Sequence, residues 1–173
     1  MKRCKVKCGN ARLTAPKWVE RLWPSDMEPS EWPTFCGAGD GIGDALVPDK
    51  IRGVRISPAC FIHDIGWATS KETVSSFLAE NWYLAWNIRA LIVASELAWW
   101  KRELAVIRAW AIYFVAVSTI GMFAFDPLKT TDEEYPLDNA IVRARLRRLA
   151  NARIGIADTD PETLTDDTEG AAI

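Results

Sequence analysis

Residues 72–120 constrain the fold most, because they contain neither glycine nor proline and are rich in apolar side chains. A stretch of this length and composition is too long for a strand and favours helix. The charged residues 101–103 predict a break within it. We therefore expect one helix over residues 72–100 and another that ends near residue 120, just before Gly121.

Two further helices are predicted on either side of this stretch. Ser57-Pro58 is typical of a helix start, because serine caps a helix and proline fits its first position, and this helix should end near Ala68. Residues 137–153 predict a shorter helix with many arginines. Thr69 and Glu72 have the spacing of a capping box for the helix that follows.

The remaining segments divide the chain into four parts. Residues 1–34 carry four prolines and predict an irregular N-terminal arm with one short helix near residues 17–22. Residues 35–127 form the predicted domain, which begins with a glycine-rich loop, and residues 128–156 contain the basic helix. Residues 157–173 hold six acids and no bases, so we expect a disordered tail. The predicted fold class is all-α.

Charge and hydropathy limit the partners of the chain. The net charge of -2 argues against nucleic-acid binding. The uncharged run over residues 109–125 favours a buried core helix, with a membrane span or contact with a bilayer surface as alternatives. No apolar stretch follows the basic start, so we expect no signal peptide and synthesis in the cytoplasm.

One short segment carries residues suited to chemistry. On a helix, Cys60, His63, Asp64 and Trp67 share one face, because they are spaced at i, i+3, i+4 and i+7. The glycines of residues 35–39 allow several backbone carbonyls to turn towards one point. Carbonyl oxygens and a carboxylate are the donors that calcium prefers.

These residues resemble two motifs of the secreted phospholipase A2 family. The family's calcium loop reads Cys-Gly-x-Gly, as in residues 36–39, and its catalytic helix reads Cys-x-x-His-Asp-x-x-Tyr, as in residues 60–67 with Trp67 in place of tyrosine. The similarity covers residues 35–125 and is closest to bacterial and phage-encoded members. It implies a phospholipase A2-like fold of long antiparallel core helices with a glycine-rich calcium loop and irregular terminal arms.

The resemblance also implies a role for each matching residue. His63 is expected to act as general base towards the water that attacks the sn-2 ester of a phospholipid. Calcium is the expected cofactor, and it would polarise the ester carbonyl. Its ligands would be the Asp64 carboxylate and the backbone oxygens of Phe35, Gly37 and Gly39.

The cysteines divide into two pairs. The resemblance implies a disulfide between Cys36 and Cys60 that ties the loop to the helix, and the alternative is two buried thiols. Cys4 and Cys8 match nothing in the family. They could pair with each other, stay reduced or contribute to a zinc site.

The chain also departs from the family pattern. The family orients the catalytic histidine with an aspartate on the antiparallel helix, and here no aspartate lies between Asp64 and Asp126. Glu80 and Asn81 are the two candidates for this role, since either side chain accepts a hydrogen bond. A tight turn after the first helix would instead bring Ser75 or Ser76 to His63.

Three functions therefore remain open. The first is calcium-dependent hydrolysis of phospholipids at a membrane surface, met by the tryptophan-rich helices and the arginine-bearing helix. It would act after release, outside the cell or in a virion. The second is an inactive phospholipase-like structural or binding component, for example of a phage particle, with protein partners on the terminal arms. The third is a protein that permeabilises bilayers through residues 109–125.

Overall fold

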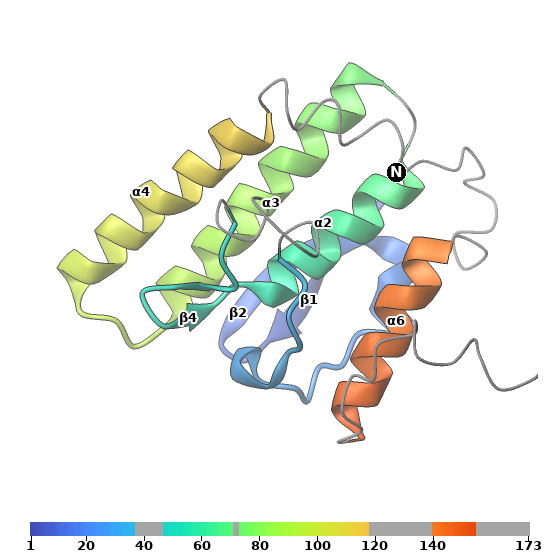
Figure 1. The fold of residues 1–173 in the computed structure, drawn as a ribbon, viewed down its shortest axis with the longest axis horizontal. Helices are drawn as coiled ribbons and strands as arrows, with labels where there is room; N and C mark the ends of the chain where they lie inside the picture. The colour runs from blue at the N-terminus through green and yellow to red at the C-terminus, as the bar shows by residue number, and fades with distance from the viewer. Residues whose placement is uncertain (37–46, 71–72, 118–139, 155–173) are drawn as a thin grey trace, which may run out of the picture.

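The computed structural model of the chain describes residues 1–36, 47–70, 73–117 and 140–154 (Figure 1). Helices make up the larger share of this part, but it also contains two antiparallel two-stranded sheets. The prediction of an all-α fold is therefore wrong, and the fold combines helices and strands. The acidic tail of residues 157–173 lies outside the described residues.

The expected N-terminal arm forms a β-hairpin. Strands β1 (Arg3–Cys8) and β2 (Ala11–Pro16) pair antiparallel through the two-residue turn Gly9-Asn10. Gly9 adopts a φ of +53°, which two-residue hairpin turns require and which glycine tolerates. A 3₁₀ helix, η1 (Lys17–Arg21), follows where a short helix was predicted.

A second, smaller hairpin leads into the first long helix. It joins β3 (Lys50–Ile51) to β4 (Val54–Arg55), and the turn residues Arg52 and Gly53 have φ values of 50° and 88°. Helix α2 (Ser57–Thr69) begins directly after it, with proline in its first turn. The predicted helix from residue 58 to about residue 68 is thus confirmed.

The long apolar stretch forms two helices, but the break lies earlier than predicted. Helix α3 (Val74–Ala94) is capped by Thr73, whose hydroxyl accepts from the Ser76 N–H at 3.1 Å. Helix α4 (Trp99–Ala116) begins before the charged residues 101–103, so these residues are helical.

The contacts of Arg102 explain how this charged residue can lie inside α4. Its guanidinium group donates to the carbonyl oxygen of Leu97 at 3.2 Å, in the loop that joins α3 to α4. The side chain therefore satisfies a free carbonyl of this loop from a position inside α4.

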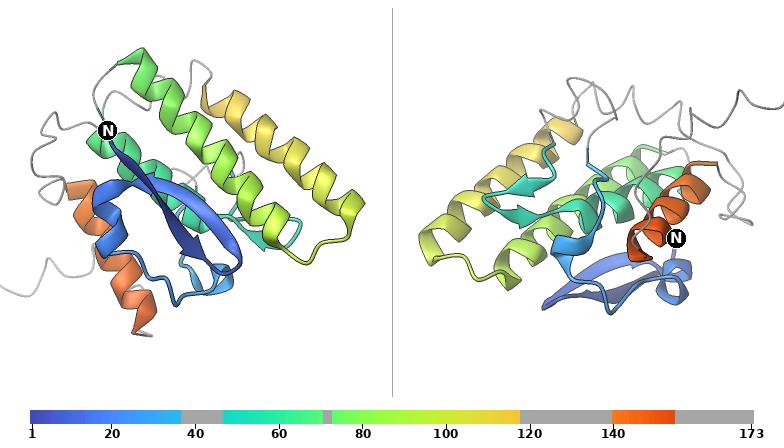
Figure 2. Two further views of the ribbon diagram at one scale, coloured as in Figure 1. Left: turned by 180° about the vertical axis from the view of Figure 1, so that it is seen from behind. Right: turned by 60° about the horizontal axis from the view of Figure 1, so that its bottom comes forward.

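The helices α2, α3 and α4 lie side by side and alternate in direction (Figure 1). The hairpin of β1 and β2 packs across one face of α2 and α3, as the views in Figure 2 show. Helix α6 (Ala140–Arg153), predicted over residues 137–153, packs against α2 on the side away from α3. Helix α2 is therefore enclosed by the hairpin, by α3 and by α6.

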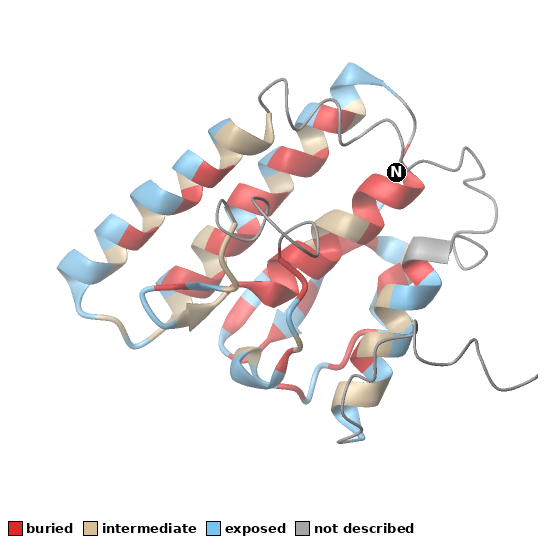
Figure 3. Ribbon diagram, in the orientation of Figure 1, coloured by how far each residue is buried: buried red, intermediate tan, exposed pale blue. Residues whose placement is uncertain are grey.

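Burial follows this arrangement (Figure 3). Helix α2 is buried over most of its length, whereas α4 buries only Ala105, Ala109 and Ile112. An aromatic cluster fills the core beneath the start of α2, in the segment that includes the 3₁₀ helix η2 (Pro29–Glu31). Its members contact one another ring to ring: Trp23, Trp32, Phe35 and Phe61.

The uncharged run of residues 109–125 is described only as far as residue 117. In this part Ala109 and Ile112 are buried, while Phe114 is 67% exposed. One face of the run packs on α3 and the other faces outward. Among the described helices, none has the length and apolarity that crossing a bilayer requires.

Candidate functional site

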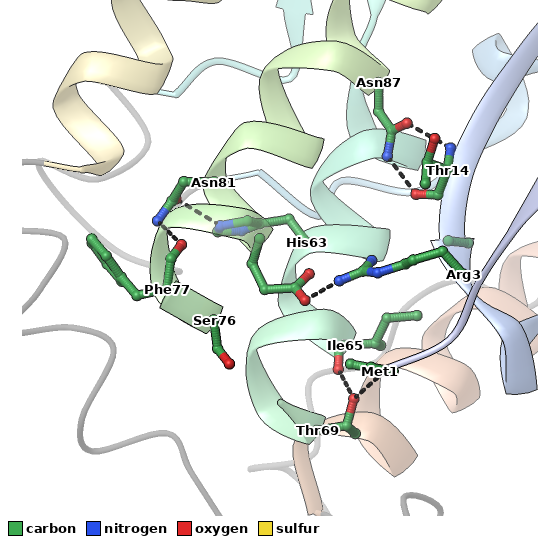
Figure 4. Close-up of polar contacts among 12 residues, drawn as sticks. Met1, Arg3, Thr14, His63, Ile65, Thr69, Ser76, Phe77, Asn81 and Asn87 are labelled. Carbon is green, nitrogen blue, oxygen red and sulfur yellow. Dashed lines mark hydrogen bonds and ion pairs between the residues drawn. The ribbon is translucent and has the colours of Figure 1, made fainter. Parts of the chain in front are cut away.

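His63 on α2 faces α3 and contacts Asn81 there (Figure 4). The His63 Nε2 and Asn81 Oδ1 atoms lie 3.0 Å apart. The Asn81 side-chain nitrogen donates to the Phe77 carbonyl at 2.9 Å. This second bond leaves the amide oxygen turned towards His63. Because Asn81 is 0% exposed, the contact holds the ring from within the core.

Asn81 also determines which nitrogen of the ring carries a proton. An amide oxygen only accepts hydrogen bonds, so in the neutral imidazole the Nε2–H donates to Asn81. The other nitrogen, Nδ1, then bears the lone pair, and it lies 3.6 Å from the Asp64 Oδ1. His63 therefore presents its basic nitrogen beside Asp64.

Aromatic rings form an apolar wall next to the imidazole. The ring centroids of His63 and Trp67, one turn further along α2, lie 4.4 Å apart. Trp67 in turn packs against Phe77 of α3 at 5.9 Å. This wall shields one face of His63, whose side chain is 10% exposed.

Asp64 makes an ion pair that the sequence did not predict. Its Oδ2 lies 2.8 Å from a guanidinium nitrogen of Arg145 on α6. The same guanidinium group lies over the ring of Phe35, 5.5 Å from its centroid. Arg145 thus contacts two of the residues that the resemblance assigns to the calcium site.

Glu80 does not contact His63. Its buried carboxylate pairs with Arg3 of β1, and the guanidinium group of Arg3 also lies over the ring of Tyr83 at 4.3 Å. A methyl group at Gly66 would overlap the Glu80 carboxylate, so a larger residue there would displace the Glu80 side chain where the two helices meet. Of the two candidates, Asn81 orients His63 and Glu80 anchors the hairpin.

The serine alternatives lie at the start of α3. Ser75 and Ser76 both contact the hydroxyl of Thr73, at 3.0 and 2.9 Å. These contacts belong to the cap of the helix. They do not bring either serine to His63.

The implied disulfide between Cys36 and Cys60 is present. It joins the start of α2 to the end of the segment that precedes residues 37–46. Asp49 supports this junction, because its carboxylate accepts from the Ser57 hydroxyl at 3.1 Å and from the Cys36 N–H at 3.4 Å. Residues 36 and 60, far apart in the chain, are thereby held together.

Two of the four implied calcium ligands, Asp64 and Phe35, lie within the described residues. A positively charged group, the Arg145 guanidinium, already lies against this carboxylate and over Phe35. Gly37 and Gly39, the other implied ligands, lie outside the described residues. In the described ranges no three His, Cys, Asp or Glu side chains form a metal cluster, but the implied calcium site needs only one carboxylate.

Cys4 and Cys8 are free thiols on β1. Burial and, to a smaller extent, the nearby Glu28 raise the pKa of Cys8 to about 12. Burial also raises the pKa of Cys4. Thiols with raised pKa values are poor nucleophiles at neutral pH. Cys8 is buried in the main core and Cys4 packs against it, so both side chains contribute to the packing of the hairpin.

Sequence reasoning missed Arg145 and Arg3. The arginines of residues 143–153 were recognised, but as contacts for a membrane, and no local signal placed one of them on Asp64. Arg3 was assigned to an irregular arm.

Comparison with protein-family models, with curated proteins and with solved structures finds no match for this chain.

Proposed function

We propose that this chain is a calcium-dependent hydrolase of phospholipid esters, of the phospholipase A2 type. One observation carries the proposal: His63 is anchored through Nε2 to Asn81 and presents Nδ1 beside Asp64. A general base must be held in one tautomer with its lone pair directed at the reacting proton. The contact of Nε2 with Asn81, which leaves Nδ1 to accept a proton, supports this role for His63.

In the proposed reaction, Nδ1 of His63 removes a proton from the water that attacks the sn-2 ester carbonyl. The imidazolium ion that forms keeps its Nε2–H bonded to Asn81. A neutral amide stabilises this charge less than a carboxylate would, so we expect a slow enzyme. The rings of Trp67 and Phe77 exclude water from one side of the base.

The cofactor proposed for this site is calcium. When bound, the ion would stabilise negative charge on the ester oxygen. The resemblance assigns its ligands to one carboxylate and three backbone oxygens: Asp64, Phe35, Gly37 and Gly39. The disulfide between Cys36 and Cys60 supports the assignment, because it holds Cys36, the neighbour of Gly37 in the chain, at the start of the helix that carries Asp64.

The outer face of α3 and α4 supports action at a lipid surface. Trp82, Trp86, Trp110 and Tyr113 form a ladder of ring contacts across the two helices. A cavity of about 420 Å³ beside Trp82 and Trp86 is also lined by basic side chains. Tryptophan favours the boundary between apolar and wet phases, and basic groups attract anionic headgroups. Other exposed apolar side chains belong to α4: Trp99, Trp100, Leu104, Ile107 and Phe114.

The test is fatty-acid release from vesicles of mixed phosphatidylcholine and phosphatidylglycerol, in calcium or in chelator. We expect release by the wild type in calcium only, and loss of release in His63→Gln, because glutamine keeps a hydrogen bond to Asn81 but is not a base. Arg147→Gln, an exposed change, is the matched control and should behave as wild type. Equal release by His63→Gln would overturn the proposal.

A second candidate is a non-catalytic binding component, favoured by the ion pair between Asp64 and Arg145. A carboxylate neutralised by arginine is a stable structural element, and Asn81 in place of an acid suits a site without turnover. Folded, disulfide-bonded protein that hydrolyses no lipid in the same assay would favour this candidate.

A further inference from the structure

The cavity of about 420 Å³ beside Trp82 and Trp86 lies between the β1–β2 hairpin and helix α3. Three basic side chains line it: Lys5 and Arg12 from the hairpin, and Arg89 from α3. Among the described residues its lining contains no acid, and the other members are Thr14, Tyr83, Asn87 and Ala90. Three cations around one cavity repel one another, so the cavity favours an anion.

The pairing of the hairpin strands brings two of these cations together. Lys5 lies opposite Thr14, and Lys7 lies opposite Arg12. Side chains alternate between the two faces of a strand, and residues directly opposite each other share a face. Lys5 and Arg12 therefore lie on the same face of the hairpin, and both are exposed.

Contacts hold the two sides of the cavity in place. The Lys5 Nζ donates to the Thr14 Oγ1 at 2.7 Å. The Arg89 guanidinium lies over the ring of Trp86, 5.0 Å from its centroid. The Asn87 amide bonds to both backbone polar groups of Thr14 (Figure 4). The hairpin cannot shift along α3 without losing these bonds, so the cations keep their positions around the cavity.

The charge at this cavity is not neutralised within the fold. Residues 1–19 contain several basic residues and no acid. Arg3 is paired with a buried carboxylate of α3. In the part of the chain that the structure describes, no carboxylate forms an ion pair with Lys5, Arg12 or Arg89. These three charges are therefore available to an anion from outside the protein.

We propose that this cavity binds the phosphate of an anionic phospholipid headgroup at a bilayer surface. Phosphate oxygens accept charge-assisted hydrogen bonds from lysine and arginine. The rim of the cavity favours a lipid over a soluble phosphate, because Trp82 and Trp86 line it and are 43% and 39% exposed. Indole rings favour the headgroup level of a bilayer. Both rings also contact Trp110 of α4, so the aromatic surface continues outward from the cavity.

The cavity is separate from the proposed reaction site. Its lining includes neither His63 nor Asn81, and the hairpin lies outside residues 35–125, which carry the resemblance to the phospholipase family. The inference rests on the proposed function only in taking a bilayer as the partner. It concerns where and how the protein docks, and docking can be measured without turnover.

The test measures partition of the full chain onto vesicles at physiological salt in chelator, where the proposed enzyme does not turn over. Wild type should bind vesicles that contain phosphatidylglycerol much more tightly than vesicles of phosphatidylcholine alone. Lys5→Gln and Arg12→Gln should each weaken binding to the anionic vesicles about fivefold, the scale for one basic group at such a surface. Lys7→Gln is the matched control and should stay within about twofold of wild type. It removes the same charge from the same face of β1 without lining the cavity.

A second measurement locates the bound phosphate. In NMR titrations with soluble dihexanoyl phosphatidylglycerol, the backbone amides of residues 5–14 and 82–90 should shift in wild type, and should shift much less when Lys5→Gln and Arg12→Gln are combined. Inorganic phosphate is titrated in parallel to distinguish the two sources of the group. Tighter binding of inorganic phosphate than of the short-chain lipid would overturn the lipid as ligand. Circular dichroism checks that each variant is folded.

The outcomes separate this inference from the proposed function. Equal losses of vesicle binding in Lys5→Gln, Arg12→Gln and Lys7→Gln would overturn the site, because diffuse attraction between charges would then be the cause. Equal binding of wild type to both kinds of vesicle, or to neither, would also overturn it. Fatty-acid release in calcium is measured apart from these experiments, so an inactive protein that docks through the cavity would keep this inference and lose the enzyme.

Discussion

Two neighbouring residues of α3, Glu80 and Asn81, serve opposite sides of the molecule. Glu80 turns to the hairpin and pairs with Arg3 of β1, and Asn87, two turns further on, bonds to the backbone of Thr14 in β2. Asn81 points to α2 and holds His63 (Figure 4). The same helix thus has a hairpin side and a histidine side.

The two sides differ in the length and the burial of their polar contacts. On the hairpin side, the charged pair is buried, and the Asn87 amide both donates to and accepts from Thr14, at 2.9 and 2.7 Å. On the histidine side, Nδ1 of His63 lies 3.6 Å from a carboxylate whose other oxygen faces a partly exposed arginine. The hairpin side is built for stability, and the histidine side keeps groups that can exchange partners.

Substitution of Glu80 should have the largest effect on stability. Glu80→Gln leaves the Arg3 charge without its buried partner, and removing one member of such a pair costs about 3 kcal/mol. We expect this loss in the free energy of unfolding from urea titration, with lipid hydrolysis per folded molecule unchanged. Glu103→Gln, an exposed change on α4, is the control. An unfolding midpoint equal to that of the control would break the distinction between the two sides.

The contact between the Asn87 amide and the Thr14 backbone allows the stability of the hairpin side to be tested with uncharged groups. Asn87→Ala leaves the backbone N–H and carbonyl of Thr14 without their side-chain partner, and each unsatisfied group carries a penalty, so about 2 kcal/mol should be lost. Thr14→Ala keeps both backbone bonds and should cost much less in the same unfolding experiment. Equal losses would show that the Thr14 side chain, rather than the bridge to Asn87, stabilises the hairpin.

The sequence predicted the histidine side better than the hairpin side, for physical reasons. Helix α2 was located because a proline marks its start and Cys60, His63, Asp64 and Trp67 share one face of it. These signals are local and depend on helix geometry alone. The disulfide followed from the resemblance of the motifs.

The hairpin was missed although its signals are present. Cys4, Val6 and Cys8 alternate with lysines, which is the period of a half-buried strand, and Gly9-Asn10 is a hairpin turn. Prolines and charges nearby outweighed this pattern and favoured an irregular arm. The all-α prediction failed on this one segment and on the short hairpin before α2.

The choice between Glu80 and Asn81 could not be made from sequence, because adjacent helical residues point about 100° apart and the start of α3 was uncertain. Thr73 settles it as the cap. The contact between Arg145 and Asp64 was likewise unpredictable, since it depends on how α6 docks against α2. Neither contact can be predicted from the sequence of one helix alone, because each depends on how two helices pack.

Substitution of Asn81 tests whether its contact with His63 limits the rate of the proposed reaction. Asn81→Asp places a carboxylate against the Nε2–H of His63, and a charged acceptor stabilises the imidazolium that forms during catalysis. We expect roughly tenfold faster fatty-acid release at saturating calcium, in a protein that loses its bond to the Phe77 carbonyl. Asn81→Leu should abolish release. If Asn81→Asp is no faster than wild type, the ring contact positions His63 but does not limit its chemistry.

The ion pair between Asp26 and Arg153, at the far end of α6, should have the smallest effect. The pKa of Asp26 is lowered, first by a hydrogen bond that its carboxylate accepts from its own backbone N–H and then by Arg153. Its stabilisation is therefore present above the ordinary aspartate pKa of about 4 and is lost as the pH falls through the lower folded value. Both side chains are mostly exposed, so water and salt screen the pair.

Asp26→Asn should consequently leave hydrogen exchange in residues 142–153 nearly unchanged at pH 7, with any difference from wild type vanishing as the pH falls below the lowered pKa of Asp26. The outer pair then contrasts with the partly buried one at Asp64, which should respond strongly when Arg145 is changed. If Asp26→Asn instead released α6 as fully as Arg145→Gln does, the helix would be held from its exposed end. The attachment of α6 would then depend on an exposed contact rather than on the partly buried pair at Asp64.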